Sequence, residues 1–259
     1  MDLGIDGRRA LVCASSQGLG LACALALARE GCMVWINGRD AGRLEAAARW
    51  LRARCAATIV PVVADLCSAS GRDTLLAACA QPDILVTNNA GPPPGSPAQW
   101  DAAAWDAALQ ANLVSAAAMI LGVIDGMRAR RFGRIVNITS AMVKSPQQPM
   151  ALSAAARAGL TAFAKAMARA AIADGVTINN LLPERIDTPR QEFMAQRLMA
   201  EHGIDRDAAR ARIAATLPAG RFGRPEEVGA ACAFLCSALA SFTTGQNLQI
   251  DGGSYAGLV

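Results

Sequence analysis

The sequence predicts an α/β fold in which a doubly wound, seven-stranded parallel sheet carries helices on both faces. Three observations lead to this prediction and to a single domain. Short β-rich runs alternate with alanine-rich, helix-prone stretches, which indicates a parallel sheet covered by helices. No Gly/Ser-rich or Pro-rich linker interrupts the alternation, and no segment repeats with a period of ~20 to 50 residues. The 259 residues, 53% of them hydrophobic, can supply the core of one large domain. We therefore expect residues 1–259 to form a single domain.

Seven runs have the length and the aliphatic composition of strands in a parallel sheet. In chain order they cover residues 9–13, 33–37, 58–64, 83–88, 134–139, 176–182 and 247–250. A helix-length segment separates each run from the next, which is the spacing of βαβ units. The strands are therefore expected to run parallel, with helices packed on both faces of the sheet.

Residues 188–218 alone break the alternation, as a charged, helix-prone insertion between the sixth strand and the final helix. In a doubly wound sheet this insertion lies beyond the carboxyl ends of the strands, where ligands bind. We expect it to act as a substrate lid. The alternative is a pair of solvated surface helices.

The charge balance favours a small-molecule partner. With 25 Lys+Arg against 21 Asp+Glu, the net charge of +4 is too weak to indicate nucleic acid or an anionic membrane as the main partner. The first residues lack the basic-then-apolar order of a secretory signal, and we expect no run of ~18 uncharged apolar residues. The protein is expected to be soluble and cytoplasmic.

The cysteines favour structural thiols over a metal site. The chain has eight cysteines, no CxxC and one histidine, so a zinc site is not expected. All eight lie inside apolar stretches and are expected to be buried, free thiols. They are Cys13, Cys23, Cys32, Cys55, Cys67, Cys79, Cys232 and Cys236.

The turn after the first strand is a candidate phosphate site. Gly18 and Gly20 stand between that strand and a helical run over residues 21–29. Glycines at this turn let backbone N–H groups approach a phosphate at the helix N-terminus, where the dipole favours anions. The alternative is a purely structural role for both glycines. The candidate cofactor-binding residues here are Ala14, Ser15, Ser16, Gln17, Gly18, Leu19 and Gly20.

Seven further motifs follow in order. They are Asp65-Leu66, Asn88-Asn89-Ala90-Gly91, Asn112-Leu113, residues 135–140 ending in Ser140, residues 183–188 (Pro-Glu-Arg-Ile-Asp-Thr), residues 224–228 (Arg-Pro-Glu-Glu-Val) and residues 245–253. With the turn at residues 13–20, their order and spacing cover nearly the whole chain. The chain thereby resembles the short-chain dehydrogenase/reductase family, which opens with TGxxxGxG. Cys13 and Ala14 replace the Thr and the first Gly of that motif.

The resemblance implies a Rossmann-type, NADP-binding domain with an oxidoreductase active site. It implies that Asn112 and Ser140 are the active-site asparagine and serine. Residues 183–188 would be the nicotinamide-side loop, in which Glu184 stands where glycine is usual. Beyond the first turn, the implied cofactor contacts are Asp65, Leu66, Asn89, Ala90, Gly91, Pro183, Ile186 and Thr188.

The end of the second strand favours NADP(H) over NAD(H). An acidic residue there would bind the free ribose 2′-OH of NAD and repel a 2′-phosphate. This chain has Arg39, whose guanidinium can bind phosphate through charge-assisted bonds. Ser15 and Ser16 are candidate helpers. The alternative is that Arg39 pairs with Asp40 or Glu45.

The tyrosine and lysine of the implied active site are absent. The family places Tyr thirteen residues after the catalytic Ser and Lys four residues later, and these positions hold Ser153 and Arg157. A phenol, with a pKa of ~10, can be pulled towards neutrality and donate a proton, whereas an alcohol is far less acidic. We expect Arg157 to hold the nicotinamide ribose, although arginine stays protonated and cannot relay protons.

Four other side chains are candidate proton donors in place of the tyrosine, and each has a simpler alternative role. Lys144 lies in the loop after Ser140, where it can instead be solvated. His202 lies in the insertion as a lone polar helix residue. Tyr255, the one tyrosine, follows the last strand and can simply pack. Arg185 can bind a substrate carboxylate or pair with Glu184.

The resulting expectation is an NADP(H)-dependent oxidoreductase that acts on a carbonyl or alcohol, with a 3-oxoacyl compound as one candidate substrate. Two alternatives remain: an NADP(H)-binding protein without redox turnover, and non-redox chemistry such as cyclisation or isomerisation. An acyl carrier is a possible partner. It would bind the basic cluster Arg128, Arg130, Arg131 and Arg134, although the helix dipole explains these charges equally well.

Two alanine-rich helical stretches, residues 106–131 and 150–173, are apolar on more than one face. Such helices need a second surface to bury. The resemblance implies that they pair across a two-fold axis, so a homo-oligomer, a tetramer, is expected.

Overall fold

A computed structural model describes residues 1–258, in which seven parallel strands form one sheet. The strands are β1 (Arg9–Val12), β2 (Met33–Gly38), β3 (Ile59–Val63), β4 (Ile84–Thr87), β5 (Gly133–Ile138), β6 (Val176–Pro183) and β7 (Asn247–Ile250). Every strand begins and ends within one residue of its predicted bounds. The predicted seven-stranded parallel sheet is confirmed.

The strand order is β3-β2-β1-β4-β5-β6-β7, so the connections reverse direction between β1 and β4. Val12 of β1 is in register with Val86 of β4. The carboxyl ends of these two strands therefore meet at the topological switch point, where doubly wound sheets bind ligands. The turns that follow β1 and β4 are the ones singled out from the sequence.

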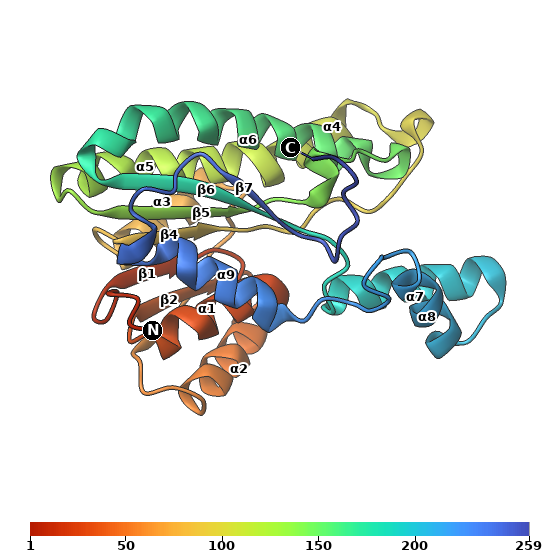
Figure 1. Cartoon of the computed structure of the whole chain (residues 1–259), viewed down its shortest axis with the longest axis horizontal. Helices are drawn as coiled ribbons and strands as arrows, with labels where there is room; N and C mark the ends of the chain where they lie inside the picture. The colour runs from red at the N-terminus through yellow and green to blue at the C-terminus, as the bar shows by residue number, and fades with distance from the viewer. Residues whose placement is uncertain (259) are drawn as a thin grey trace.

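Helices cover both faces of the sheet, as predicted (Figure 1). They are α1 (Gly18–Arg29), α2 (Ala41–Arg52), α3 (Ala69–Ala78), α4 (Ala102–Leu109), α5 (Ser115–Ala129), α6 (Ala151–Ala171), α7 (Pro189–His202), α8 (Arg206–Ala214) and α9 (Pro225–Cys236). One buried apolar cluster joins α1, α2 and α9 to one face. A second joins α3, α5 and α6 to the other.

A single helical rod over residues 102–129 joins α4, a π-helical turn (Gln110–Val114) and α5. Residues 107–124 carry no charged side chain, so the expectation that no such run exists is wrong. By length and composition alone this rod is apolar enough to cross a membrane. Many of its apolar side chains, among them Met119, Ile120 and Met127, are buried in the cluster with α3 and α6. Its apolar character is therefore that of a core helix of this fold.

The insertion forms the helices α7 and α8, which project beyond the carboxyl end of β6 (Figure 1). Ala195, Ala209 and Ile213 are the buried residues of a small apolar cluster of its own. Helices are therefore present where the sequence predicts them, and the role of a lid stays a prediction.

The predicted burial of the cysteines is correct for six of the eight. Cys55 and Cys67 are half-buried, and all eight are free thiols. Burial raises the pKa of Cys13 to about 12, so this thiol beside the first turn stays protonated at neutral pH.

Candidate active site

The turn after β1 depends on its two glycines. Gly18 begins α1 with φ at +59°, in the left-handed region that favours glycine. A Cβ on Gly20 would lie 2.5 Å from the Ala14 carbonyl oxygen, so only glycine lets α1 approach the turn this closely. Ala14 itself has φ at +44°, although it replaces the first glycine of the motif. Gln17 precedes α1 without a side-chain cap, which leaves the first N–H groups of the helix available to an anion.

Ser15 and Ser16 differ in their surroundings. The Ser15 hydroxyl donates to the Val12 carbonyl at 2.7 Å and accepts from the Asn37 amide at 2.9 Å, and the residue is fully buried. Ser15 therefore shapes the turn from inside. The Ser16 hydroxyl has no hydrogen bond in residues 1–258, and a Cβ on Gly38 would lie 3.1 Å from it. Of the two serines, only Ser16 keeps a free hydroxyl beside the end of β2.

Arg39 follows β2 and is exposed. The expected alternative pairings are not formed, because Asp40 caps α2 by accepting from the Arg43 amide and Glu45 pairs with Arg52. Within the described residues Arg39 has no ion pair. The Arg39 guanidinium at the end of β2 is therefore available to a ligand.

Three loops meet at the switch point. Asn88 Nδ2 donates to the Ala14 carbonyl at 3.1 Å, which joins the turn after β4 to the turn after β1. Thr188, at the start of α7, lies about 3.8 Å from the position of a Cβ on Gly18. Ile186 is buried and forms a bridge with Gly223. The end of the loop over residues 183–188 thus lies beside the turn after β1, and its role as a nicotinamide-side loop stays a prediction.

The remaining residues singled out for the cofactor lie on the same edge. Leu66 is buried and lines a cavity beside Asn88 and Asn89, and Asp65 is exposed with its carboxylate accepting from the Cys67 amide. Asn89 Nδ2 donates to the Ala111 carbonyl, which fixes the turn after β4 to the helix behind it. The candidate cofactor residues therefore follow the carboxyl edge of the sheet from the end of β3 to the start of α7.

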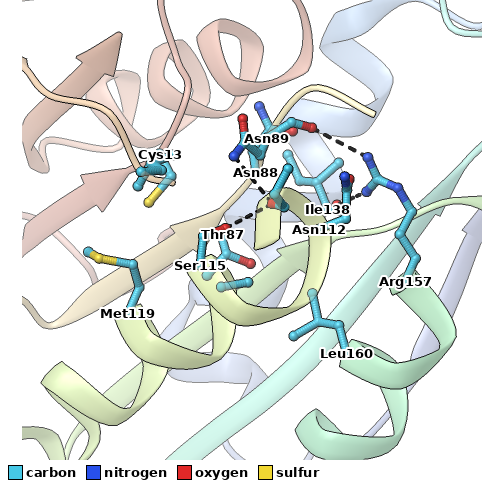
Figure 2. Close-up of a pocket in the computed structure, with 13 residues that line it drawn as sticks. Cys13, Thr87, Asn88, Asn89, Asn112, Ser115, Met119, Ile138, Arg157 and Leu160 are labelled. Carbon is cyan, nitrogen blue, oxygen red and sulfur yellow. Dashed lines mark hydrogen bonds between the residues drawn. The ribbon is translucent and has the colours of Figure 1, made fainter. Parts of the chain in front are cut away.

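Arg157 is bound to two strand ends (Figure 2). Its Nη1 donates to the carbonyls of Ile138 at 2.8 Å and Thr139 at 3.0 Å, and its Nη2 donates to that of Asn89 at 3.3 Å. Its Nε donates to the Ser153 hydroxyl at 3.3 Å. Four of the five guanidinium N–H groups are thereby used, and one on Nη2 stays free. Burial, and secondarily the charge of Arg190, lower the pKa of Arg157 to about 10, so it is cationic at neutral pH.

Asn112 stands in the π-helical turn between α4 and α5. Such turns are frequent at functional sites. Its Nδ2 donates to the carbonyls of Ala90 and Ala108, each at 3.4 Å, whereas its Oδ1 is buried without a partner in the described chain. Asn112 and Arg157 both line a cavity of about 10 Å³, close to the smallest that admits one water molecule. A residue with an unpaired, buried acceptor thus lines this cavity.

Ser140 follows β5 and begins a short 3₁₀ turn (Ala141–Val143). Its hydroxyl accepts from the Met142 amide at 3.2 Å and keeps its own hydrogen for another acceptor. It is the residue after Thr139, whose carbonyl Arg157 binds. Ser140, Ser153, Arg157 and Asn112 are therefore brought to one region, although they come from three separate segments.

The substitute donors are distributed differently. Lys144 and Tyr255 lie together, with the ammonium 5.0 Å from the ring centroid, and Lys144 also donates to Gln249. His202 lies at the end of α7 beside Glu201 and makes no contact with the region around Arg157 in residues 1–258. Arg185 has φ at +51°, and its Nε is buried without a partner in the part of the chain described. The pairing of Lys144 with Tyr255 was not foreseen.

A polar ladder that the sequence did not reveal crosses four strands. Thr87 Oγ1 donates to Asn137 at 2.6 Å, and Asn137 Nδ2 donates to Asn180 at 2.9 Å. Asn180 Nδ2 donates in turn to Asn247 at 2.7 Å. Each pair is in register on neighbouring strands, so the ladder fixes the relative positions of β4 to β7 next to the site.

Most arginines of the basic cluster that is a candidate carrier-protein surface pair with acidic side chains. It comprises Arg128, Arg130, Arg131 and Arg134. Arg134 is buried and donates to the Ser237 carbonyl, and the other three pair with Asp174 or Asp83. Arg134 also lies near the start of β5, at the opposite edge of the sheet from Ser140. A docking role for this cluster stays a prediction.

Comparison with known proteins agrees with this architecture. The family described as "Enoyl-(Acyl carrier protein) reductase" matches residues 13–255. The 3-oxoacyl-[acyl-carrier-protein] reductase FabG of Escherichia coli (strain K12) is 30% identical over 253 residues, covering 98% of this chain and 99% of that protein.

Two solved structures extend the comparison. L-sorbose reductase from Gluconobacter frateurii, complexed with NADPH and L-sorbose, superposes with a TM-score of 0.93 at 30% identity, covering 100% of both chains. A 3-oxoacyl (acyl-carrier-protein) reductase from Agrobacterium tumefaciens C58 with NADP bound has a TM-score of 0.87 at 30% identity, covering 97% of this chain and 96% of the other.

Proposed function

We propose a function for this chain from the family to which it belongs, the short-chain dehydrogenase/reductase family. The proposed function is that of an NADP(H)-dependent oxidoreductase that interconverts a carbonyl compound and its alcohol. The observation that carries the proposal is the convergence of Asn112, Ser140 and Arg157 beside the switch point of the sheet. The relatives named 3-oxoacyl reductases support an oxoacyl-like substrate.

The residues of the chain fit an NADP(H) cofactor. Gly20 lets α1 pack closely against the turn after β1, and the uncapped start of α1 would offer N–H groups to the diphosphate. Arg39, which is exposed, and the free Ser16 hydroxyl beside Gly38 would bind the 2′-phosphate. Pro183, Ile186 and Thr188 would hold the nicotinamide end. When bound, the cofactor supplies or accepts the hydride.

The polar side chains would act on the substrate oxygen. Ser140 has a free hydroxyl hydrogen with which to bind the negative charge that develops on this oxygen. Arg157 adds a fixed positive charge and one free N–H group. Ser153 holds Arg157 and is not the acid, because an alcohol cannot release its proton near neutral pH. The proton comes from water or from a side chain other than Ser153.

One observation favours a second candidate, an NADP(H)-binding protein without turnover. Four of the five N–H groups of Arg157 are bonded to the protein itself, so little of this side chain is free to hold a ribose. A protein without the tyrosine, in which the arginine is hydrogen-bonded to the backbone, can still bind the cofactor without catalysing the reaction.

The two candidates are separated by measuring cofactor oxidation and cofactor binding in parallel. We expect NADPH absorbance to fall with at least one member of a panel of ketones, aldehydes and 3-oxoacyl thioesters, and the fall to depend on Ser140. Calorimetric binding of NADPH with no turnover on the whole panel would favour the second candidate. Absence of NADPH binding would contradict both.

A further inference from the structure

Three arginines bind carbonyl groups of one loop, residues 89–94. Arg157 of α6 donates to the Asn89 carbonyl at 3.3 Å. Arg190 and Arg197 of α7 donate to the carbonyls of Pro92 and Pro94, each at 2.9 Å. The loop thus lies between Arg157 and the insertion. Its carbonyl groups accept hydrogen bonds from guanidinium groups of both α6 and α7.

These cations have no carboxylate partner. In residues 1–258, none of the three forms an ion pair, because each is held by uncharged carbonyl oxygens. Burial lowers the pKa of both Arg157 and Arg190, and the charge of a neighbouring arginine lowers each further, that of Arg190 acting on Arg157 and that of Arg197 on Arg190. Neighbouring like charges without a counter-charge are unfavourable. An anion would relieve this repulsion.

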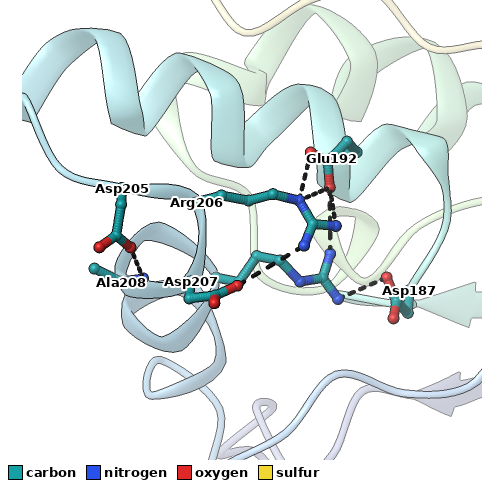
Figure 3. A network of polar contacts seen from close by, with 7 residues as sticks. Asp187, Glu192, Asp205, Arg206, Asp207 and Ala208 are labelled. Atoms are coloured by element: carbon teal, nitrogen blue, oxygen red, sulfur yellow. Dashed lines mark hydrogen bonds and ion pairs between the residues drawn. The ribbon is translucent and has the colours of Figure 1, made fainter.

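The acidic residues at the base of the insertion are engaged elsewhere (Figure 3). Glu192 binds Arg206 through contacts of 2.8 to 3.1 Å and also lies 3.7 Å from Arg210. Asp187 pairs with Arg210 at 2.9 Å. These carboxylates are neutralised by α8, and none of them reaches Arg190 or Arg197. The side of α7 that contacts the loop is left with unbalanced positive charge.

We propose that the substrate carries an anionic group, a carboxylate or a phosphate, and that this group binds between Arg190 and Arg157 at the loop over residues 89–94. The inference rests on the proposed oxidoreductase function. Arg190 uses one of its five N–H groups on Pro92 and keeps four, and Arg157 keeps one on Nη2. Arg190 can therefore bind such an anion through two N–H groups, and Arg157 can add one more.

The cofactor is the other source of an anion near this site. Its phosphates already have candidate partners in the uncapped start of α1 and in Arg39. The substrate is therefore the occupant to which the proposal commits. An effect confined to NADP(H) affinity is the outcome that would assign the arginines to the cofactor instead.

Binding is tested in the complex with NADP⁺, so that the result does not depend on turnover. Oxo acids of four to eight carbons and their methyl esters are titrated by calorimetry. We expect at least one acid to bind about tenfold or more tightly than its ester. Arg190→Gln should reduce that preference to roughly threefold or less, while Arg190→Lys, which keeps the charge, should retain part of it.

The ester separates charge recognition from simple opening of the insertion, because loss of the contact with Pro92 would weaken acid and ester equally. Arg212→Gln, at an exposed position on α8, makes the same charge change away from the loop and should alter neither affinity. Equal binding of every acid and its ester in the parent overturns the proposal. So does an Arg190→Gln variant whose NADP⁺ affinity falls while the acid-to-ester preference stays. Tighter binding of the acid than of its ester, with no turnover on any substrate, would support the anion site and contradict only the proposed reaction.

Discussion

Arg157 donates from Nε to the hydroxyl of Ser153, 3.3 Å away and one turn earlier on α6. The same guanidinium reaches the ends of β4 and β5 through the carbonyls of Asn89, Ile138 and Thr139. Ser153 and Arg157 therefore connect α6 to these strand ends. They occupy the two positions at which the resemblance implies a proton-donating tyrosine and a lysine.

The first prediction concerns the two serines. Ser153→Ala should leave any reductase turnover within a few-fold of the parent, whereas Ser140→Ala should lower it by about 10²-fold or more. The reason is that Ser140 can bind developing charge directly, while the Ser153 hydroxyl serves Arg157. Steady-state kinetics of both variants check this. Loss of turnover in Ser153→Ala with NADPH affinity intact would make Ser153 part of the proton path.

Arg157 should matter for stability as well as for chemistry. Arg157→Met leaves the carbonyls of Ile138, Thr139 and Asn89 without their shared donor, and should lower the free energy of unfolding by roughly 2 to 4 kcal/mol. Urea unfolding measures the change. Arg169→Met, at an exposed position on the same helix, serves as the control and should change stability little. Similar stability of the two variants would show that the carbonyl bonds contribute nothing net.

Arg39 should select the cofactor. Arg39→Asp removes a free cation at the end of β2 and adds repulsion, so NADPH affinity should fall at least about tenfold while NADH affinity changes little. Calorimetry with both cofactors measures the difference. Arg43→Asp makes the same charge change within α2 and should have a smaller effect. Equal losses for NADPH and NADH in Arg39→Asp would point to a structural role.

The chain should associate. Val114 and Leu121, on the rod that carries α5, are 42% and 55% exposed despite being large and apolar. Burying them against a second copy would remove this surface from water. Light scattering at micromolar concentration should give the mass of a homo-oligomer, with a tetramer expected. A monomeric mass would contradict the expectation.

The central strands β4, β5 and β6 could be predicted closely because each contains a short aliphatic run that parallel packing buries on both faces. The glycine turn could be predicted because its conformational demand is local, and Gly18 does adopt a positive φ. In both cases the information lies within a few neighbouring residues.

The partners of polar side chains could not be predicted in the same way. Ser15 was a candidate phosphate ligand, but its hydroxyl is occupied by Val12 and Asn37, and the second of these becomes a neighbour only when β2 lies beside the turn after β1. Similarly, Asp83 and Asp174 neutralise the basic cluster from distant parts of the sequence. Long-range pairing decides which charges remain free.

The central claim is that this site transfers a hydride between NADP(H) and a substrate carbon. The most direct measurement is to supply NADPH carrying deuterium at C4 of the nicotinamide, on each face in turn, and to analyse the alcohol product by mass spectrometry. The account predicts deuterium on the former carbonyl carbon from one face only, with the transfer rate reduced in Ser140→Ala. Product that forms without deuterium from either face would contradict it.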